Sequence, residues 1–480
     1  MNKAMILAIT PQLILSFGVV ISLLLVAWQR STKLIQSFTI TILAIALYAT
    51  VDLKGIENIQ VTALLAVDSN SLVSLILVLL SGLAIALFSQ LYLSRHTEVH
   101  DEYYILLQLV ILAAAILVVS DHFASVFLGF ELLSVSLVGL VGYLRNSDKG
   151  LESAFKYLIL SATASSFMLL GIAFIYGYTG NLAFSAVNHT HHLVDHLYLA
   201  GIILFLLGLC FKLSLVPFHH WTPDVYQGSP TPVTMLLATV SKTAMFTVLI
   251  KYWFSQTNYN NTTLVEIISI IAILSMLVGN IMALRQENLK RLLGYSSIAH
   301  MGYLLIVILI SSPQGVDFAW QVMQFYLAAY LIASLAIFMV IIICEQQNKN
   351  LAQVDYQQWR GLFLRSPLLA TTVIVSILSF AGIPLTMGFI GKFYLLTQAS
   401  QQHLWLLISV LIVGSGIALF YYLRIIFVLF ESLDNVKNDA VSSLSEPIFM
   451  PIPLRFVITL FAFAGISFGI FPDLYHYLLP

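Results

Sequence analysis

Four lysines of the sequence lie inside stretches of apolar residues, where a charge is unusual: Lys156, Lys212, Lys242 and Lys392. A charge at the centre of a bilayer costs at least about 2.5 kcal/mol, so such residues usually serve a function. Apolar surroundings and nearby like charges disfavour an ammonium, so a buried lysine can release its proton. The pattern predicts a row of proton carriers.

The position of each lysine within its apolar stretch decides how strongly it favours a function in proton transfer. Lys242 lies deep within one helix-length stretch, out of reach of either membrane surface. Lys212 and Lys392 lie beside prolines that could admit water for structural reasons. Lys156 lies near the start of its stretch, where snorkelling to the surface explains it equally well. On this argument alone Lys156 ranks last.

Glu131 is the acidic residue in the middle of a predicted span, within Phe127-Leu-Gly-Phe-Glu131-Leu-Leu-Ser. Desolvation disfavours its carboxylate and a nearby ammonium favours it, so its charge depends on what approaches it. We predict a switchable partner for a lysine. The alternative is a structural counter-charge, because buried charges are usually paired.

Two prolines and a histidine add to this pattern. Pro384 lies mid-span between glycines and predicts a broken helix lined by water, whereas Pro217 either breaks its helix or ends it. His300 is a candidate proton relay, since imidazole titrates near neutral pH. A hydrogen-bonded contact between helices is an equal alternative for His300.

The composition is that of an integral membrane protein. The 480 residues are 60% hydrophobic and 9% charged, with a mean hydropathy of +0.95, whereas soluble domains carry about 25% charged residues. The formal net charge of −1 gives no basic field for nucleic acid. Cys210 and Cys344 are far apart, and the histidines around 189–196 lack ligand spacing, so we predict neither a cluster nor a metal site.

Apolar stretches long enough to cross the hydrocarbon layer number about fourteen, which predicts an all-α integral membrane fold. They lie at about 5–28, 34–51, 71–93, 103–120, 122–143, 153–178, 197–217, 231–254, 264–285, 291–312, 318–344, 367–398, 402–430 and 453–479.

The distribution of basic residues between loops predicts the orientation. One set of alternate loops holds most of them, including Arg30, Arg145 and Arg291, and the other set holds only Lys3, Lys54 and Lys251. Cytoplasmic loops retain positive charge. Both termini are therefore predicted on the non-cytoplasmic side, and the polar stretch at 345–366 is predicted to lie along the membrane surface as a connector.

Two weak internal echoes predict an inverted repeat. Tyr157-Leu158 with Ala164-Ser165 is echoed at the same offsets by Tyr326-Leu327 with Ala333-Ser334. A lysine with a nearby proline also occurs in both halves, as Lys212 with Pro217 and as Lys392 with Pro384. Both echoes are shifted by five spans, and an odd shift inverts the second half. We predict N-terminal helices in 1–100, five-helix repeats in 101–260 and 261–431, and a loop with a last helix in 432–480.

Several motifs surround the charged residues: Gly129-Phe-Glu131-Leu, Phe211-Lys-Leu-Ser-Leu-Val-Pro-Phe-His219, Trp221-Thr-Pro-Asp-Val-Tyr-Gln-Gly228, Ser241-Lys242 and Gly382-Ile-Pro384 with Gly388-Phe-Ile-Gly-Lys-Phe393. They resemble the antiporter-like membrane subunits of respiratory complex I, which are similar to subunits of multi-subunit cation/proton antiporters. The resemblance spans most of the chain. Leu292-Leu-Gly-Tyr-Ser-Ser-Ile298 and the lysine at 392 resemble subunit N of the bacterial NADH-quinone oxidoreductase more than subunits L and M.

The resemblance implies a role for each site residue. Glu131 and Lys212 would form a modulating ion pair, Lys242 would be the central proton carrier and Lys392 the terminal one. Lys156 matches a further lysine of the family, which raises it above its physical ranking.

The resemblance also implies the setting of the chain. It would be a multi-pass protein of the bacterial inner membrane, in contact with other antiporter-like subunits and small membrane subunits. No cofactor would bind to this chain, because NADH, FMN, iron–sulfur clusters and quinone belong to partner subunits.

Two other functions compete with proton translocation in complex I. A free-standing cation/proton antiporter would need oxygen ligands for sodium near the midplane, and of the acidic residues only Glu131 is available there. A structural anchor that pumps nothing would not need four costly lysines.

Overall fold

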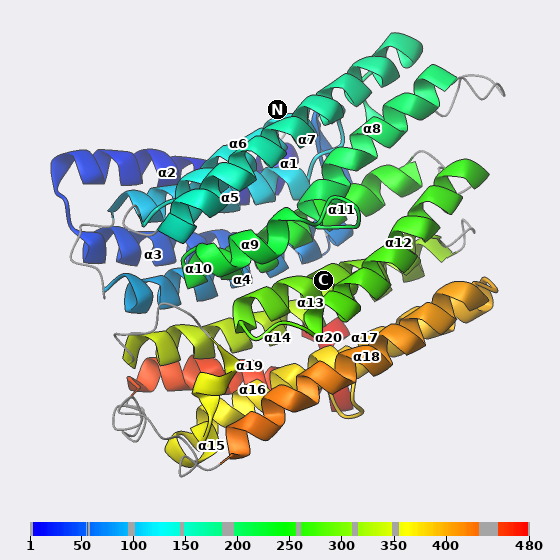
Figure 1. The fold of residues 1–480 in the computed structure, drawn as a ribbon. Helices are drawn as coiled ribbons and strands as arrows, with labels where there is room; N and C mark the ends of the chain where they lie inside the picture. Colours follow the sequence, from blue (N-terminus) through cyan, green and yellow to red (C-terminus); the bar gives the residue numbers. More distant parts are fainter. Residues whose placement is uncertain are drawn as a thin grey trace.

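The computed structural model consists almost entirely of helices (Figure 1). It describes residues 3–94 except 54, 56 and 57, and then 101–144, 148–184, 196–255, 261–309, 315–347, 355–431 and 450–478. A backbone in hydrocarbon must satisfy its own hydrogen bonds, and apolar stretches of this length do so as helices.

The elements run in the following order: α1 (Lys3–Ala8), α2 (Thr10–Trp28), α3 (Thr32–Asp52), β1 (Ile59–Thr62), β2 (Leu65–Val67), α4 (Ser69–Leu93), α5 (Asp101–Val118), α6 (Phe123–Val141), α7 (Asp148–Thr179), α8 (His196–Lys212), α9 (Trp221–Gly228), α10 (Thr231–Ala238), α11 (Val240–Ser255), α12 (Thr262–Ala283), α13 (Leu289–Leu304), η3 (Leu305–Leu309), α14 (Val316–Gln347), η5 (Tyr356–Trp359), α15 (Leu362–Arg365), α16 (Pro367–Ala381), α17 (Met387–Gln401), α18 (Trp405–Phe430), α19 (Ile452–Ile470) and α20 (Asp473–Leu478).

The predicted membrane spans are confirmed. Twelve helices in the described part are long and apolar enough to cross a membrane, and the shorter apolar helices α8 and α16 supply two more. We call the end of the bundle where α2 meets α3 the basic end, because the described loop residues Arg30, Arg285 and Arg360 lie there, and the other the opposite end. Strand β2, the start of α4 and the end of α11 then lie at the opposite end.

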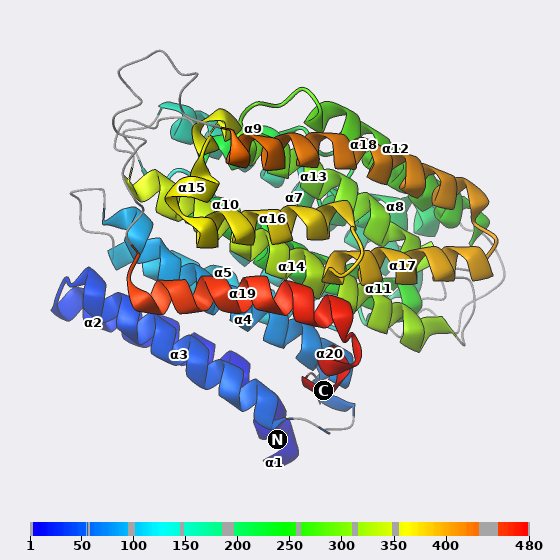
Figure 2. The same ribbon diagram turned by 90° about the horizontal axis from the view of Figure 1, so that it is seen from below.

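Burial separates central from peripheral helices. The spans formed by α10 with α11 and by α13 with η3 are buried throughout their most apolar 18 residues, whereas in α2, α3 and α19 at most 33% of such a window is buried. Figure 2 shows α2 and α3 along one edge of the bundle, with α12 and α18 far from them. Lys242 and His300 therefore lie in the protein interior, while exposed apolar faces surround them.

The two predicted broken helices are confirmed. Helix α8 ends at Lys212, Ser214 is left-handed, and the chain continues toward the basic end as α9. Helix α16 ends before Gly382, which is also left-handed, and the chain continues as α17. Because α8 and α16 are the seventh and twelfth crossings, they run in opposite senses, as an inverted repeat requires. The domain boundaries at 100, 260 and 431 stay predictions.

Two features were not predicted. A third irregularity lies at Thr239, between α10 and α11, three residues before Lys242. The short antiparallel pair β1 and β2 lies between α3 and α4 and packs against α1. The predicted connector at 345–366 is only partly described, and η5 and α15 lie within it.

Candidate functional site

Lys212 is the last residue of α8, and its side chain is buried. Its Nζ atom donates to Tyr157 Oη at 2.6 Å and to Ser161 Oγ at 3.3 Å. It also lies 4.9 Å from the centre of the Phe130 ring. A helix C-terminus carries partial negative charge, which favours an ammonium there. The broken helix thus makes a buried site for a cation.

Glu131 follows Phe130 on α6 and is half-buried. It acts electrostatically on Lys212. Among the ion pairs of the described residues, which reach to 4.0 Å, none joins the two groups. The predicted pair is therefore open in this conformation, with the Lys212 ammonium held by Tyr157 instead. That the pair closes during function stays a prediction.

Lys242 lies in the first turn of α11 and is fully buried. Its Nζ atom donates to the hydroxyl of Ser297 on α13. Ser297 belongs to the same stretch of α13 as His300, so the contact directs Lys242 toward the second repeat. A buried ammonium held by one neutral hydroxyl can lose its proton without leaving an unpaired carboxylate behind.

His300 connects the surroundings of Lys242 with those of Lys392. Its Nδ1 atom lies 2.7 Å from Tyr326 Oη and its Nε2 atom 3.4 Å from Tyr422 Oη. Both lysines act electrostatically on His300. A cavity of about 10 Å³ is lined by His300, Lys392 and tyrosines of α14, which is room for about one water. His300 thus makes the hydrogen-bonded contact between helices that was the alternative for it, and its part as a proton relay stays a prediction.

Lys392 lies on α17 and is buried. Its Nζ atom donates to the carbonyl of Ala381 at 3.0 Å and to Ser415 Oγ at 3.2 Å, and it lies 5.2 Å from the centre of the Tyr303 ring. Ala381 is the last residue of α16. Lys392 and Lys212 therefore both occupy the C-terminal end of a half-helix, although Lys392 comes from the second half and Lys212 from the first.

Lys156 does not lie with the other lysines. Its side chain is 42% exposed and pairs with Glu152 at 2.6 Å and with Asp224 of α9 at 3.0 Å. Asp224 also accepts from Arg291 of α13 at 2.6 Å. Lys156 is therefore partly exposed and paired with carboxylates, unlike the three buried lysines. Its part in proton transfer stays a prediction.

A second buried charged group escaped the sequence analysis. Lys290, at the start of α13, donates to Ser229 O at 2.7 Å and to Thr231 Oγ1 at 3.3 Å, and Thr231 in turn donates to Glu345 at 3.0 Å. All four residues are buried at the basic end. Lys290 and Glu345 flank apolar stretches, so counting them as loop charges hid them. Each lies directly beside the end of an apolar stretch, and this closeness was the signal that could have indicated their burial.

Gly382 makes room for Lys392, and a substitution tests this. Its φ is +79°, and a Cβ atom there would lie 2.7 Å from Lys392 Cδ. Gly382→Ala adds about 1 kcal/mol of backbone strain and displaces the ammonium. We expect less proton pumping by the assembled complex. Gly416→Ala is the matched control, because a Cβ atom there has open space. Equal pumping by the two variants would contradict the role of Gly382.

Metal ligands do not gather in the described part of the chain, where no group of three His, Cys, Asp or Glu side chains could hold an ion. His189, His191 and His192 lie outside the described residues.

Comparison with known proteins gives one family and several structures of the same fold. Residues 120–418 match the family described as NADH:quinone oxidoreductase/Mrp antiporter, transmembrane. A chain of respiratory complex I from Thermus thermophilus is 30% identical, with 97% of this chain and 98% of that one covered and a TM-score of 0.82.

Two further structures share the fold at lower identity. A chain of an archaeal membrane-bound sulfane sulfur reductase is 23% identical, with coverage of 99% and 96% and a TM-score of 0.86. A chain of the Mrp complex from a Dietzia species is 20% identical, with coverage of 100% and 96% and a TM-score of 0.84.

Proposed function

The chain belongs to the NADH:quinone oxidoreductase/Mrp antiporter transmembrane family, and we propose that it is the proton-translocating subunit N of an NADH-quinone oxidoreductase. It is an antiporter-like membrane subunit of complex I or of a related complex. The choice of complex I, and of subunit N within it, rests on the motifs around Leu292–Ile298 and Lys392.

One observation carries the proposal: the buried basic groups each contact neutral partners. We call Lys212, Lys242 and Lys392 the lysine row. Its ammonium groups donate to hydroxyls of Tyr157, Ser161, Ser297 and Ser415 and to the Ala381 carbonyl. A structural ion pair would hold its proton permanently, whereas an ammonium with neutral partners can release it.

The proposed mechanism alternates the charge on the row. When Lys212 moves toward Glu131, its repulsion of Lys242 relaxes and Lys242 takes up a proton. When that pair opens, repulsion returns and the proton passes by way of His300 and a cavity water to Lys392. Quinone reduction elsewhere in the complex drives the cycle, because NADH, FMN, iron–sulfur clusters and quinone belong to partner subunits.

Two other functions, a cation/proton antiporter and a non-pumping anchor, compete with this proposal. A cation/proton antiporter needs oxygen ligands for sodium, and Glu131 is the acidic group beside the row. A non-pumping anchor gives no reason for buried lysines with neutral partners. We therefore favour proton translocation over both rivals. In this proposal the chain lies in a bacterial inner membrane with both termini on the non-cytoplasmic side. Other antiporter-like subunits and small membrane subunits pack against its exposed apolar helices.

A purification followed by a pumping assay tests the proposal. The tagged chain should copurify with NADH-oxidising, quinone-reducing activity, and vesicles holding this complex should acidify when given NADH and quinone without sodium. Proton movement that needs sodium and no NADH would favour the antiporter. Unchanged acidification by a complex whose row lysines are all replaced by methionine would favour the anchor.

A further inference from the structure

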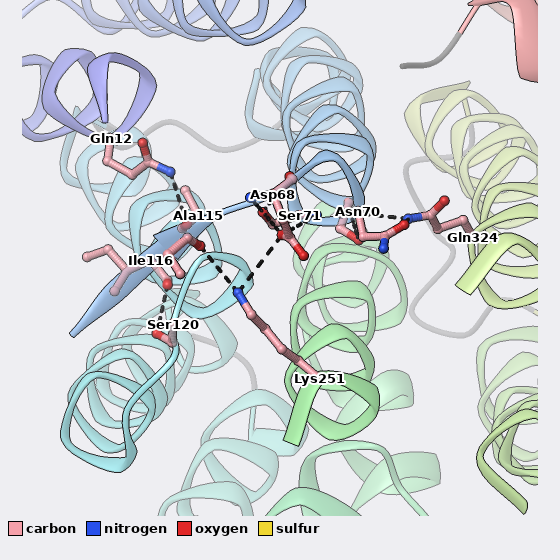
Figure 3. Close-up of polar contacts among 11 residues, drawn as sticks. Gln12, Asp68, Asn70, Ser71, Ala115, Ile116, Ser120, Lys251 and Gln324 are labelled. Carbon is pink, nitrogen blue, oxygen red and sulfur yellow. Dashed lines mark hydrogen bonds and ion pairs between the residues drawn. The ribbon is translucent and has the colours of Figure 1, made fainter. Parts of the chain in front are cut away.

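Lys251 is a partly buried charge outside the lysine row. From the sequence we expected Lys251 in a loop, but it lies within α11 and its side chain is 12% exposed. Its Nζ atom donates to Ala66 O at 3.2 Å and lies 4.0 Å from Asp68 Oδ1. Figure 3 shows it reaching from α11 toward Asp68 and Ser71 at the start of α4. Lys251 thus marks the opposite end of the bundle.

Asp121 is a second carboxylate beside Lys251. It lies between α5 and α6, where its backbone N–H donates to Leu64 O at 3.1 Å, two residues before the Ala66 carbonyl that Lys251 binds. Lys251 and Asp68 both act on it electrostatically. Burial raises the pKa of Asp121; Lys251 opposes this and Asp68 adds to it, and the pKa stays above its ordinary value. Lys251, Asp68 and Asp121 together have a formal charge of −1, because one ammonium lies near two carboxylates. One of the carboxylates can therefore take up a proton.

A stripe of hydroxyls leads along α11 to this group. Thr239, Thr243, Thr247 and Lys251 are spaced four residues apart and therefore share one face of the helix. The three threonines are fully buried. Their hydroxyls donate to carbonyls one turn back, at 2.6, 3.0 and 2.8 Å, and keep lone pairs for a further donor.

The stripe starts beside the central carrier. Thr239 lies at the irregularity between α10 and α11, and Lys242 follows three residues later, in the adjacent row of the helix surface. Successive hydroxyls are one turn apart, about 5.4 Å, a separation that one bridging water spans.

We propose that Thr239, Thr243 and Thr247 line a proton outlet from Lys242 to Asp121 and Asp68, separate from the route through His300 and Lys392. This inference rests on the proposed function. In each passage the Lys242 ammonium gives its proton to a water at Thr239, and the proton moves along hydroxyls and waters to the Asp121 carboxylate. The acid then releases it to the medium, and the fixed charge of Lys251 favours that release.

A structural role explains only part of the arrangement. Lys251 and Asp68 could simply fasten α11 to β2 and α4. A purely structural contact of this kind does not need the buried hydroxyls of Thr239, Thr243 and Thr247. Their described hydrogen bonds reach only the carbonyl one turn back in the same segment. The hydroxyls are therefore the feature to test.

Substitutions at Thr247 in the assembled complex separate the two roles. Thr247→Val keeps the shape and removes the hydroxyl, and we expect NADH-driven acidification of vesicles to fall at least about tenfold, as when a proton-transfer group is lost. The solvent deuterium isotope effect should rise, and Thr247→Ser should restore pumping. Thr372→Val is the matched control, since Thr372 is buried and bonds within its own helix, α16.

The outcomes are distinct. Pumping by Thr247→Val equal to that of Thr372→Val overturns the outlet, and equal losses in Thr247→Val and Thr247→Ser mean a packing effect and overturn it too. If Thr247→Val does not assemble, Asp121→Asn decides: the outlet requires a loss of pumping, and native pumping overturns it. Wild-type complex that does not acidify vesicles contradicts the proposed function instead.

Discussion

Lys242→Ala leaves the complex assembled but lowers NADH-driven proton pumping at least about tenfold, the scale of a lost proton-transfer group. Alanine removes the titratable group without adding volume to an entirely buried position. Quinone reduction coupled to pumping falls with it, because the central step of the row is gone. Vesicle acidification and NADH oxidation measure both effects, and Lys33→Ala, at an exposed position, is the control.

Lys242→Arg distinguishes a mobile proton from a fixed charge. Arginine keeps the positive charge and can donate to Ser297, but it does not release its proton at neutral pH. We expect pumping nearly as low as with alanine. Pumping at the native proton-to-electron ratio would mean that a fixed charge suffices and that Lys242 does not cycle its proton.

Glu131→Gln and Lys212→Ala each reduce pumping strongly, and together they cost less than the two losses combined. The reason is that Glu131 acts on Lys212 and has its effect through that residue. Groups that act as a unit show interaction energies of about 0.5 to 3 kcal/mol in such a cycle. The logarithms of the pumping rates of the wild type, the two single variants and the double variant give the coupling directly.

The open geometry makes this double-mutant cycle informative. Lys212 donates to Tyr157 and Ser161, not to Glu131. If the pair never closes, the losses add, and the switch is excluded even though both residues matter. Tyr157→Phe offers a further comparison, since it removes the hydroxyl that holds Lys212 in the open position.

The membrane fold was predictable because its cause is local. Each span is an apolar stretch that must satisfy its own backbone, so length and composition alone located the helices that cross the membrane. The breaks followed from Pro217 and Pro384, whose missing donors interrupt a helix. The buried lysines followed likewise, because a charge inside an apolar stretch is conspicuous in the sequence.

What escaped prediction depends on distant contacts. The break at Thr239 has no proline or glycine to announce it. The contacts of Lys251 could not be predicted, because its carbonyl and carboxylate partners, Ala66 and Asp68, come from far earlier in the chain. Lys290 and Glu345 are linked through Thr231, and no spacing rule relates positions so far apart.

Asp224 has a consequence for how ionic strength acts on the protein. Its carboxylate binds Lys156 of α7 and Arg291 of α13, so one partly exposed group joins α9 to both repeats. Added electrolyte shortens the screening length to about 8 Å at physiological concentration and weakens such exposed pairs, while buried groups are hardly affected. Salt therefore weakens the ionic contacts of α9 with α7 and α13 and leaves the interior charges of the lysine row unscreened.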